Sequence, residues 1–129
     1  MSKTALAVAR ACLQAYVDKD RAAIESLLDE DFHFTSPLDN ALDRATYMRI
    51  CWPNSATLAH FDGIYELEQN DRAFIVYEAQ TSSGKRFRNS EVYTVRNGKL
   101  VATEVYFGWE LPHTVPRGAH VAGKDAGHP

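Results

Sequence analysis

The sequence predicts an α+β fold, in which three amino-terminal helices pack on a strongly curved, mainly antiparallel sheet. Up to about residue 57 the apolar residues recur at helical spacing, and from there to residue 108 they alternate with polar residues. Short polar turns separate the alternating runs, which is typical of an antiparallel meander. Because the helices precede the strands rather than interleave with them, the pattern favours α+β over a parallel α/β fold.

The composition is that of one soluble globular domain. Apolar residues make up 45% of the 129 residues and charged residues 24%, which is enough for a single substantial core. The balance of 14 basic and 17 acidic residues gives no basic surface of the kind that binds nucleic acid. No apolar run approaches the roughly 20 residues of a membrane helix, and the charged amino terminus does not resemble a signal peptide. We therefore expect a cytoplasmic protein that binds neither nucleic acid nor membrane.

Three helices are predicted in the first half of the chain. An apolar stripe from Leu6 to Val17 predicts the first helix. Asp20 is the expected N-cap of a second, short helix whose apolar residues run to Leu28. Asp43 is the expected N-cap of a third helix, which we predict to end at Pro53.

Five segments are predicted to be strands. The short segment 31–37 alternates two phenylalanines with polar residues and stops at a proline. The four longer runs are residues 57–69, 72–81, 86–95 and 99–108. The tail has no periodicity and is rich in Pro, Gly and His. The predicted domain therefore covers residues 1–109, and residues 110–129 form an irregular extension.

The last hairpin decides which of its two carboxylates points inward. A two-residue turn at Asn97-Gly98 would place Glu91 opposite Glu104, and like charges that face each other across strands are unfavourable. A three-residue loop with the glycine left-handed in a bulge instead pairs Glu91 with Thr103. We therefore expect Glu91 on the inner face and Glu104 on the outer face, an assignment that a one-residue error would reverse.

This register gives the hairpin an inner and an outer face. The inner face carries Asn89, Glu91, Tyr93, Val95, Val101, Thr103, Val105 and Phe107. The outer face carries Arg88, Ser90, Val92, Leu100, Ala102, Glu104 and Tyr106. Such an outer face is too apolar for a surface left in water. We therefore expect a homodimer through the outer face, with Arg88 and Glu104 paired across a two-fold axis.

Three helices, a strand that ends in Ser-Pro and a meander that closes with "VRNGKLVATEVYFG" resemble the nuclear transport factor 2-like superfamily, and within it the SnoaL-like proteins. The resemblance covers roughly residues 4–109. It implies a cone-shaped α+β barrel that encloses a ligand pocket and dimerises through its sheet. Members include ketosteroid isomerases, scytalone dehydratase, limonene epoxide hydrolase, polyketide cyclases and non-catalytic modules, so the fold does not settle the function.

Among these members, ketosteroid isomerase offers one chemical match. Its general-base aspartate precedes a proline at the end of the first strand, where this chain has Ser36. Its oxyanion tyrosine on the first helix falls at or near Cys12, and its protonated oxyanion acid falls at Glu91. A serine without a partner cannot serve as the base. The limonene epoxide hydrolase pattern requires an aspartate–arginine–aspartate cluster, whereas the candidate strands carry glutamates.

Glu91 is the first candidate for chemistry, because an inward acid tuned by burial can act as a general acid or base. A satisfied structural carboxylate is an equally good interpretation. Glu78 and His60 are the other catalytic candidates, with a rim carboxylate in water and a structural histidine as their plainer interpretations. Polar and aromatic residues expected on the pocket wall are the ligand-binding candidates. They are Ser36, Cys51, Trp52, Asn89, Tyr93, Thr103 and Phe107.

Motifs for metals and cofactors are missing from the sequence. It has no HxH or HExxH spacing, no glycine-rich phosphate loop and no G-x-S-x-G elbow. We therefore expect neither a metal nor a cofactor. One open class is a cofactor-free isomerase, dehydratase, cyclase or hydrolase that uses Glu91 with Glu78 or His60. The alternatives are a non-catalytic module for a small apolar or mixed-polarity organic ligand, and a protein-interaction scaffold.

Overall fold

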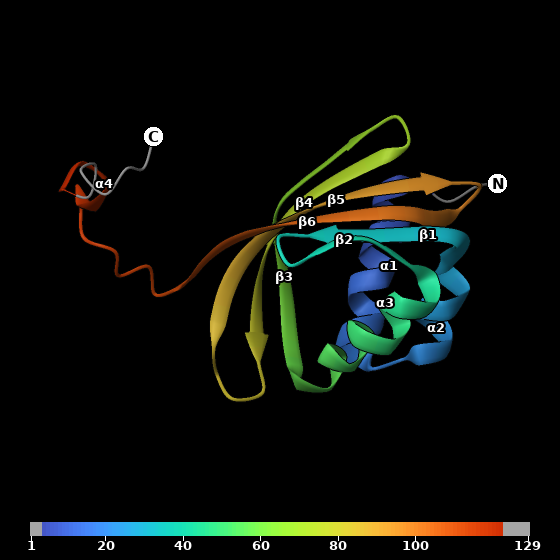
Figure 1. Cartoon of the computed structure of the whole chain (residues 1–129), viewed down its shortest axis with the longest axis horizontal. Coiled ribbons are helices and arrows are strands. Elements are labelled where there is room, and N and C mark those ends of the chain that lie inside the picture. Colours follow the sequence, from blue (N-terminus) through green and yellow to red (C-terminus); the bar gives the residue numbers. More distant parts are fainter. Residues whose placement is uncertain (1–3, 123–129) are drawn as a thin grey trace.

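The computed structural model describes residues 4–122, in which three helices cover one face of a six-stranded sheet (Figure 1). The helices are α1 (Ala5–Asp18), α2 (Arg21–Leu27), α3 (Arg44–Ile50), a 3-10 helix (Trp52–Thr57) and a short carboxy-terminal α4 (Ala119–Ala122). The strands are β1 (Leu28–Ser36), β2 (Asp39–Asp43), β3 (Leu58–Gln69), β4 (Arg72–Thr81), β5 (Arg86–Arg96) and β6 (Lys99–Leu111). These elements confirm the α+β class and the change of period near residue 57.

The sheet is open and mixed. Its strand order is β2-β1-β6-β5-β4-β3, and every pairing is antiparallel except that of β1 with β6. The two ends of the sheet do not pair, so the curved sheet is open and the helices complete the predicted α+β cone. The helices lie on the concave side of this sheet (Figure 1). No helix within residues 4–122 has the length and apolar character needed to span a membrane.

The predicted starts of α2 and α3 agree with the structure, because an N-cap depends only on residues that are close in the sequence. The Asp20 carboxylate accepts a hydrogen bond from the Ala23 N–H at 3.0 Å, and α2 begins at the next residue. Asp43 caps α3 in the same way. The helix ends differ from the prediction: Leu28 opens β1 instead of closing α2. Pro53 lies in the first turn of the 3-10 helix, where its missing N–H costs no hydrogen bond.

The β1–β2 hairpin was missed in part, because β2 itself was not predicted. Its five residues carry only two apolar side chains, so their alternation gives no signal. The chain reverses at Pro37-Leu38, and Ser36 pairs with Asp39. This hairpin brings Asp39 to the end of β1.

The β5–β6 hairpin has a different register from the prediction. Asn97 and Gly98 form a two-residue loop with φ values of 55° and 77°, the left-handed values that such a tight turn needs. A bulge next to Val95 then shifts the pairing, so that Glu91 pairs with Val105 and Glu104 with Val92. The two glutamates are separated, as expected, but by a bulge after a two-residue loop instead of by a three-residue loop.

The observed register differs from the predicted one by two residues. Because successive side chains of a strand point to opposite faces, a shift of two residues leaves most of them on the predicted face. Glu91 points to the helices and Glu104 to the outside. Only the residues beside the bulge exchange places: Leu100 is buried in the core, whereas Val101 is not part of it. The expectation that Leu100 lies on the outer face is therefore wrong.

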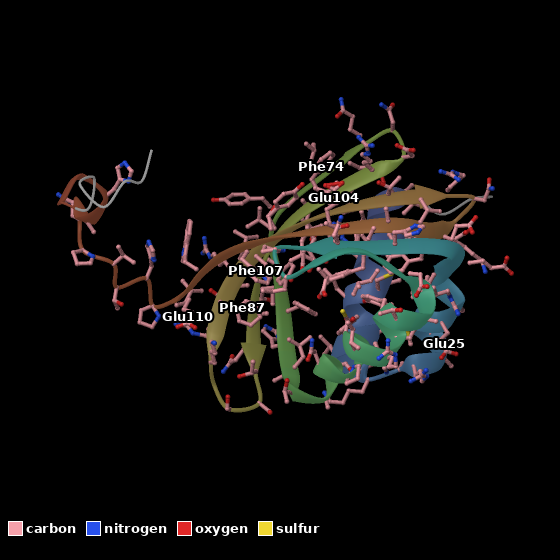
Figure 2. All side chains as sticks on the ribbon, in the orientation of Figure 1. Glu25, Phe74, Phe87, Glu104, Phe107 and Glu110 are labelled. Carbon is pink, nitrogen blue, oxygen red and sulfur yellow. The ribbon has the colours of Figure 1, made fainter. Side chains whose placement is uncertain are left out.

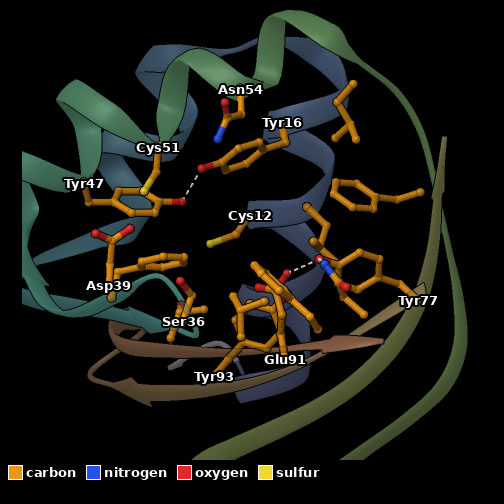
Figure 3. Close-up of a pocket in the computed structure, with 18 of the residues that line it drawn as sticks. Cys12, Tyr16, Ser36, Asp39, Tyr47, Cys51, Asn54, Tyr77, Glu91 and Tyr93 are labelled. Atoms are coloured by element: carbon orange, nitrogen blue, oxygen red, sulfur yellow. Dashed lines mark hydrogen bonds between the residues drawn. The ribbon is translucent and has the colours of Figure 1, made fainter. Parts of the chain in front are cut away.

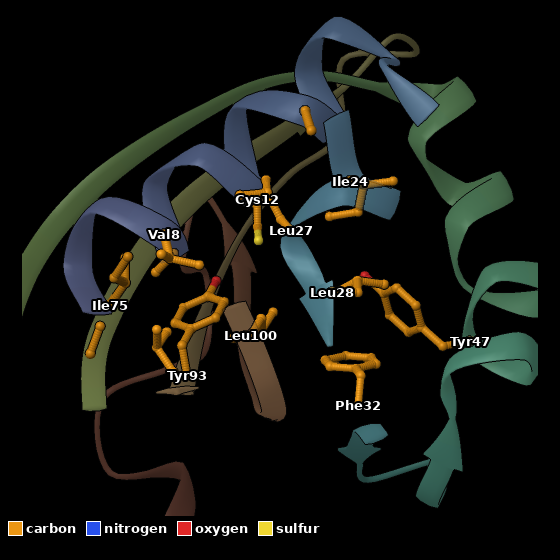
Figure 4. Close-up of a cluster of buried hydrophobic side chains, with 14 of the residues drawn as sticks. Val8, Cys12, Ile24, Leu27, Leu28, Phe32, Tyr47, Ile75, Tyr93 and Leu100 are labelled. Atoms are coloured by element: carbon orange, nitrogen blue, oxygen red, sulfur yellow. The ribbon is translucent and has the colours of Figure 1, made fainter. Parts of the chain in front are cut away.

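The core fills the space between the helices and the inner face of the sheet (Figure 4). Its largest fully buried side chains are Tyr93, Phe32, Ile24, Ile75 and Val8.

Strand β6 continues to Leu111, two residues past the expected end of the domain. The chain then leads away from the sheet and helices to α4 (Figure 1).

Candidate functional site

A cavity of about 280 Å³ lies between the helices and the inner face of the sheet (Figure 3). This volume is at the small end for ligand sites. Most of its lining is apolar and comprises Leu13, Phe34, Leu58, Phe61, Phe87, Leu100 and Val105. Leu38 and Phe107 also line it and are largely exposed, so they mark its mouth.

Most of the predicted site residues meet at this cavity. Those that line it are Ser36, Cys51, Asn89, Glu91, Tyr93, Thr103 and Phe107. They come from β1, β5, β6 and the end of α3, which are far apart in the sequence and adjacent in the fold. What each does to a ligand stays a prediction.

Glu78 does not share the cavity, contrary to the expectation. On β4 the buried residues are Ala73, Ile75, Tyr77 and Ala79, so Glu78 points to the opposite face. Its carboxylate lies 3.8 Å from the Arg86 guanidinium. The sequence of β4 does not show which face is buried, because the residues on each of its two faces include apolar side chains.

His60 and Trp52 are also outside the cavity lining. The exposed His60 imidazole lies 3.0 Å from the Asp62 carboxylate, while the next residue, Phe61, lines the cavity. Trp52 is buried and packs edge-on against Tyr16, with ring centroids 4.9 Å apart. Trp52 therefore supports a wall residue without lining the cavity itself.

Glu91 is the central polar group of the sheet wall. The Tyr77 hydroxyl donates a hydrogen bond to Glu91 Oε2, and the Tyr93 side chain lies beside the same carboxyl group (Figure 3). Burial raises the pKa of Glu91 from its ordinary value, and the two tyrosines lower it by a smaller amount. Glu91 therefore keeps its proton over a wider pH range than an exposed glutamate, and in that form it can donate a hydrogen bond.

Asn89 fixes the position of Tyr77. Its Oδ1 accepts a hydrogen bond from the Gly108 N–H at 3.1 Å, so its Nδ2 faces the Tyr77 hydroxyl at 3.4 Å. Gly108 is required here, because a Cβ on it would come within 2.2 Å of the Arg88 carbonyl oxygen. The close approach of β5 and β6 thus orients the chain of polar groups that ends at Glu91.

The helical wall carries a second polar group. The hydroxyls of Tyr16 and Tyr47 share a hydrogen bond, and burial raises the pKa of both phenols (Figure 3). Burial, and then the charge of Asp39, raises the pKa of the Cys51 thiol to about 11. Cys51 is therefore a thiol at neutral pH, which argues against a role as a nucleophile.

Asp39 and three tyrosines are cavity residues that sequence reasoning missed. Asp39 lies on the unpredicted strand β2. Tyr16 lies one turn after Cys12, where the resemblance suggested a tyrosine. Tyr77 could have been found from strand pairing, since it is the cross-strand partner of Asn89. Within residues 4–122 no group of three or more metal-ligating side chains is placed to hold an ion.

The chain was compared with known proteins. No family model matches it. No curated protein matches it either. Solved structures do match: a crystallised protein from Kribbella flavida DSM 17836 superposes with a TM-score of 0.75 at 17% identity, covering 98% of this chain and 100% of that one.

Two further solved structures give the same picture. An NTF2-like protein of unknown function from Burkholderia xenovorans LB400 has a TM-score of 0.72 at 20% identity, over 92% of this chain and 91% of that one. An LEH-like epoxide hydrolase from M. tuberculosis has a TM-score of 0.69 at 13% identity, over 81% and 82%. At such identities a match shows the fold and no activity. The chain therefore has the NTF2-like fold that its sequence resemblance implies.

Proposed function

We propose that the protein binds a small, mainly apolar carbonyl compound in this cavity and promotes proton transfer on it without a cofactor. Glu91 is the acid that hydrogen-bonds the carbonyl oxygen, and a water molecule or buffer base that enters through the mouth of the cavity takes the proton from the adjacent carbon. The observation that carries the proposal is a single carboxyl group of raised pKa on the sheet wall of an otherwise mostly apolar cavity, held there by Tyr77. A protonated acid in a dry site stabilises the negative charge that develops on the oxygen of an enolising ketone.

Acetophenone is a suitable probe, since it has one carbonyl oxygen, an apolar ring and exchangeable methyl protons. We expect it to bind with a dissociation constant in the millimolar range or below. We also expect the protein to accelerate exchange of its methyl protons in D2O above the buffer rate, measured by proton NMR. Glu91→Gln should lower the rate to that of buffer. Glu78→Gln makes the same substitution on the other face of the sheet and should leave exchange unchanged.

Two results would count against this function. Binding without accelerated exchange would favour the second candidate, a non-catalytic binding module. That candidate is supported by the apolar walls and by the hydrogen bond that Glu91 already accepts from Tyr77. Failure of acetophenone to bind at all, tested by calorimetry in the millimolar range, would contradict both.

We further propose that the active form is a homodimer through the outer face of the sheet. Cross-strand pairing places six apolar or aromatic side chains together on this face: Tyr65, Leu67, Phe74, Val76, Val92 and Tyr106. Figure 2 shows Phe74 and Glu104 on the side of the sheet away from the helices. Tyr65 and Leu67 are 67% and 62% exposed, which is unusual for large apolar side chains gathered in one patch.

Tyr106→Glu is expected to dissociate this dimer, because it replaces an aromatic ring of the apolar interface with a charge. Light scattering at micromolar concentration should give a dimer for the wild type and a monomer for the variant. Ala22→Glu, on the exposed surface of α2, adds the same charge elsewhere and should remain dimeric. A monomeric wild type, or a dimeric Tyr106→Glu, would assign this face another role.

A further inference from the structure

Two groups of polar side chains face the cavity from different parts of its wall (Figure 3). One group is centred on Glu91 and Tyr77, from β5 and β4. The other is centred on Asp39, from β2, and the Tyr47 hydroxyl, from α3. In the sheet order, β1 and β6 separate β2 from β5, so the two strands are roughly 14 Å apart along the sheet at about 4.8 Å per strand. Phe34 and Ser36 of β1 and Thr103 and Val105 of β6 line the cavity between them.

Asp39 is a carboxylate that faces the cavity without a partner from its own chain. It is partly buried, and no hydrogen bond or ion pair to its side chain is found within residues 4–122. The charge of Asp39 also helps to raise the pKa of the Cys51 thiol. The Asp39 carboxylate is therefore an acceptor on the cavity wall, with which a donor on a bound molecule can pair.

Tyr16 and Tyr47, which line the same cavity, supply the complementary group. The shared hydrogen bond between Tyr16 and Tyr47 uses one of the two hydroxyl protons, so the pair retains one donor. This part of the cavity wall therefore offers both an acceptor, Asp39, and a donor. A hydroxyl group both donates and accepts, whereas an ammonium group can only donate. The arrangement thus fits a hydroxyl better than an amine.

We infer that the ligand has oxygen at both ends: a carbonyl oxygen that meets Glu91 and a hydroxyl group that donates to Asp39, with a flat apolar body between them. This inference rests on the proposed function and adds the substrate class, a hydroxylated aromatic or conjugated ketone. Asp39 acts as a specificity-determining residue. It discriminates against ketones that lack the second oxygen, because binding them would leave its charge without a donor.

The test compares 4-hydroxyacetophenone with acetophenone at about pH 6, where a phenol is neutral. Wild-type protein should bind the hydroxylated ketone about tenfold more tightly, as expected for one hydrogen bond to a charged acceptor. In Asp39→Asn this preference should disappear, so that the two ketones bind equally. The control is Asp31→Asn, which removes one charge from an exposed position on β1 outside the cavity and should keep the preference.

A ligand-side comparison keeps the inference testable if Asp39→Asn fails to fold. The compound 4-methoxyacetophenone keeps the second oxygen but has no proton to donate, so wild-type protein should bind it no better than acetophenone. Equal binding of all three ketones to the wild type, or a hydroxyl preference that survives in folded Asp39→Asn, would overturn the two-ended site and leave the proposed function standing. If neither acetophenone nor its hydroxyl derivative binds, the proposed function fails, and this inference fails with it.

Discussion

Glutamine in place of Glu91 is expected to make the protein more stable than the wild type at about pH 8, by roughly 1 kcal/mol, the scale of an imperfectly compensated buried polar group. The reason is that burial disfavours the charged carboxylate. At this pH the wild type loses free energy either by burying a charged Glu91 or by holding a proton that the unfolded chain would release. Glutamine has the same shape, stays neutral and can still accept the hydrogen bond from Tyr77.

The pH dependence follows from the direction of this shift. The pKa of Glu91 is raised in the folded state, so the folded protein binds the proton more tightly than the unfolded chain, in which a glutamate has a pKa of about 4.3. The contribution of Glu91 to the free energy of unfolding is therefore most favourable below that pKa. It decreases as the pH rises through the window up to the folded pKa.

Thermal unfolding of the two proteins at a series of pH values checks this expectation. The difference in Tm between Glu91→Gln and the wild type should be smallest near pH 4 and should grow towards neutral pH. Glu78→Gln, on the opposite face of the sheet, controls for the loss of one negative charge. A wild type that is the more stable protein at about pH 8 would assign Glu91 to structure rather than to ligand handling.

The largest loss of stability is expected for Phe32→Ala. Phe32 is 1% exposed and packs edge-on against Tyr47, with ring centroids 4.9 Å apart (Figure 4). Removing a buried phenyl ring costs about 3–5 kcal/mol, through lost burial and the cavity left behind. That is a large share of the 5–15 kcal/mol by which domains are usually stable.

This substitution also reaches the binding site, since the ring of Phe32 is one of the supports of Tyr47. The measurement is the free energy of unfolding from urea titration, with Phe32→Leu as the graded control that keeps most of the apolar volume. Phe87→Ala removes the same ring from a partly buried position in the cavity lining and should cost less. Equal losses for Phe32→Ala and Phe87→Ala would show that burial does not distinguish the two rings as the structure indicates.

Local signals predicted most of the secondary structure. The caps Asp20 and Asp43 fix where α2 and α3 begin, because a cap needs only a side chain and an N–H three residues later. The four long strands lie within a few residues of their predicted ends, since alternation and short polar turns are also local. β2 escaped prediction because its pairing with β1, rather than its own composition, makes it a strand.

The register of the last hairpin shows where local rules stop. Like-charge repulsion indicated correctly that Glu91 and Glu104 must not face each other. It did not decide between a longer loop and a bulge, since both separate the charges. The bulge depends on which side chain the core accepts, and the core takes Leu100.

What the sequence by itself determined is the order and kind of the elements apart from β2, and the inward direction of Glu91, which survives a register error of two residues. Only the tertiary structure decided which residues share the cavity with that carboxyl group. Asp39, Tyr47 and Tyr77 lie on three elements whose meeting depends on strand order and on the curvature of the sheet around the helices. The pKa of Glu91 likewise depends on burial by neighbours distant in sequence, and no pattern of spacing along the chain contains that information.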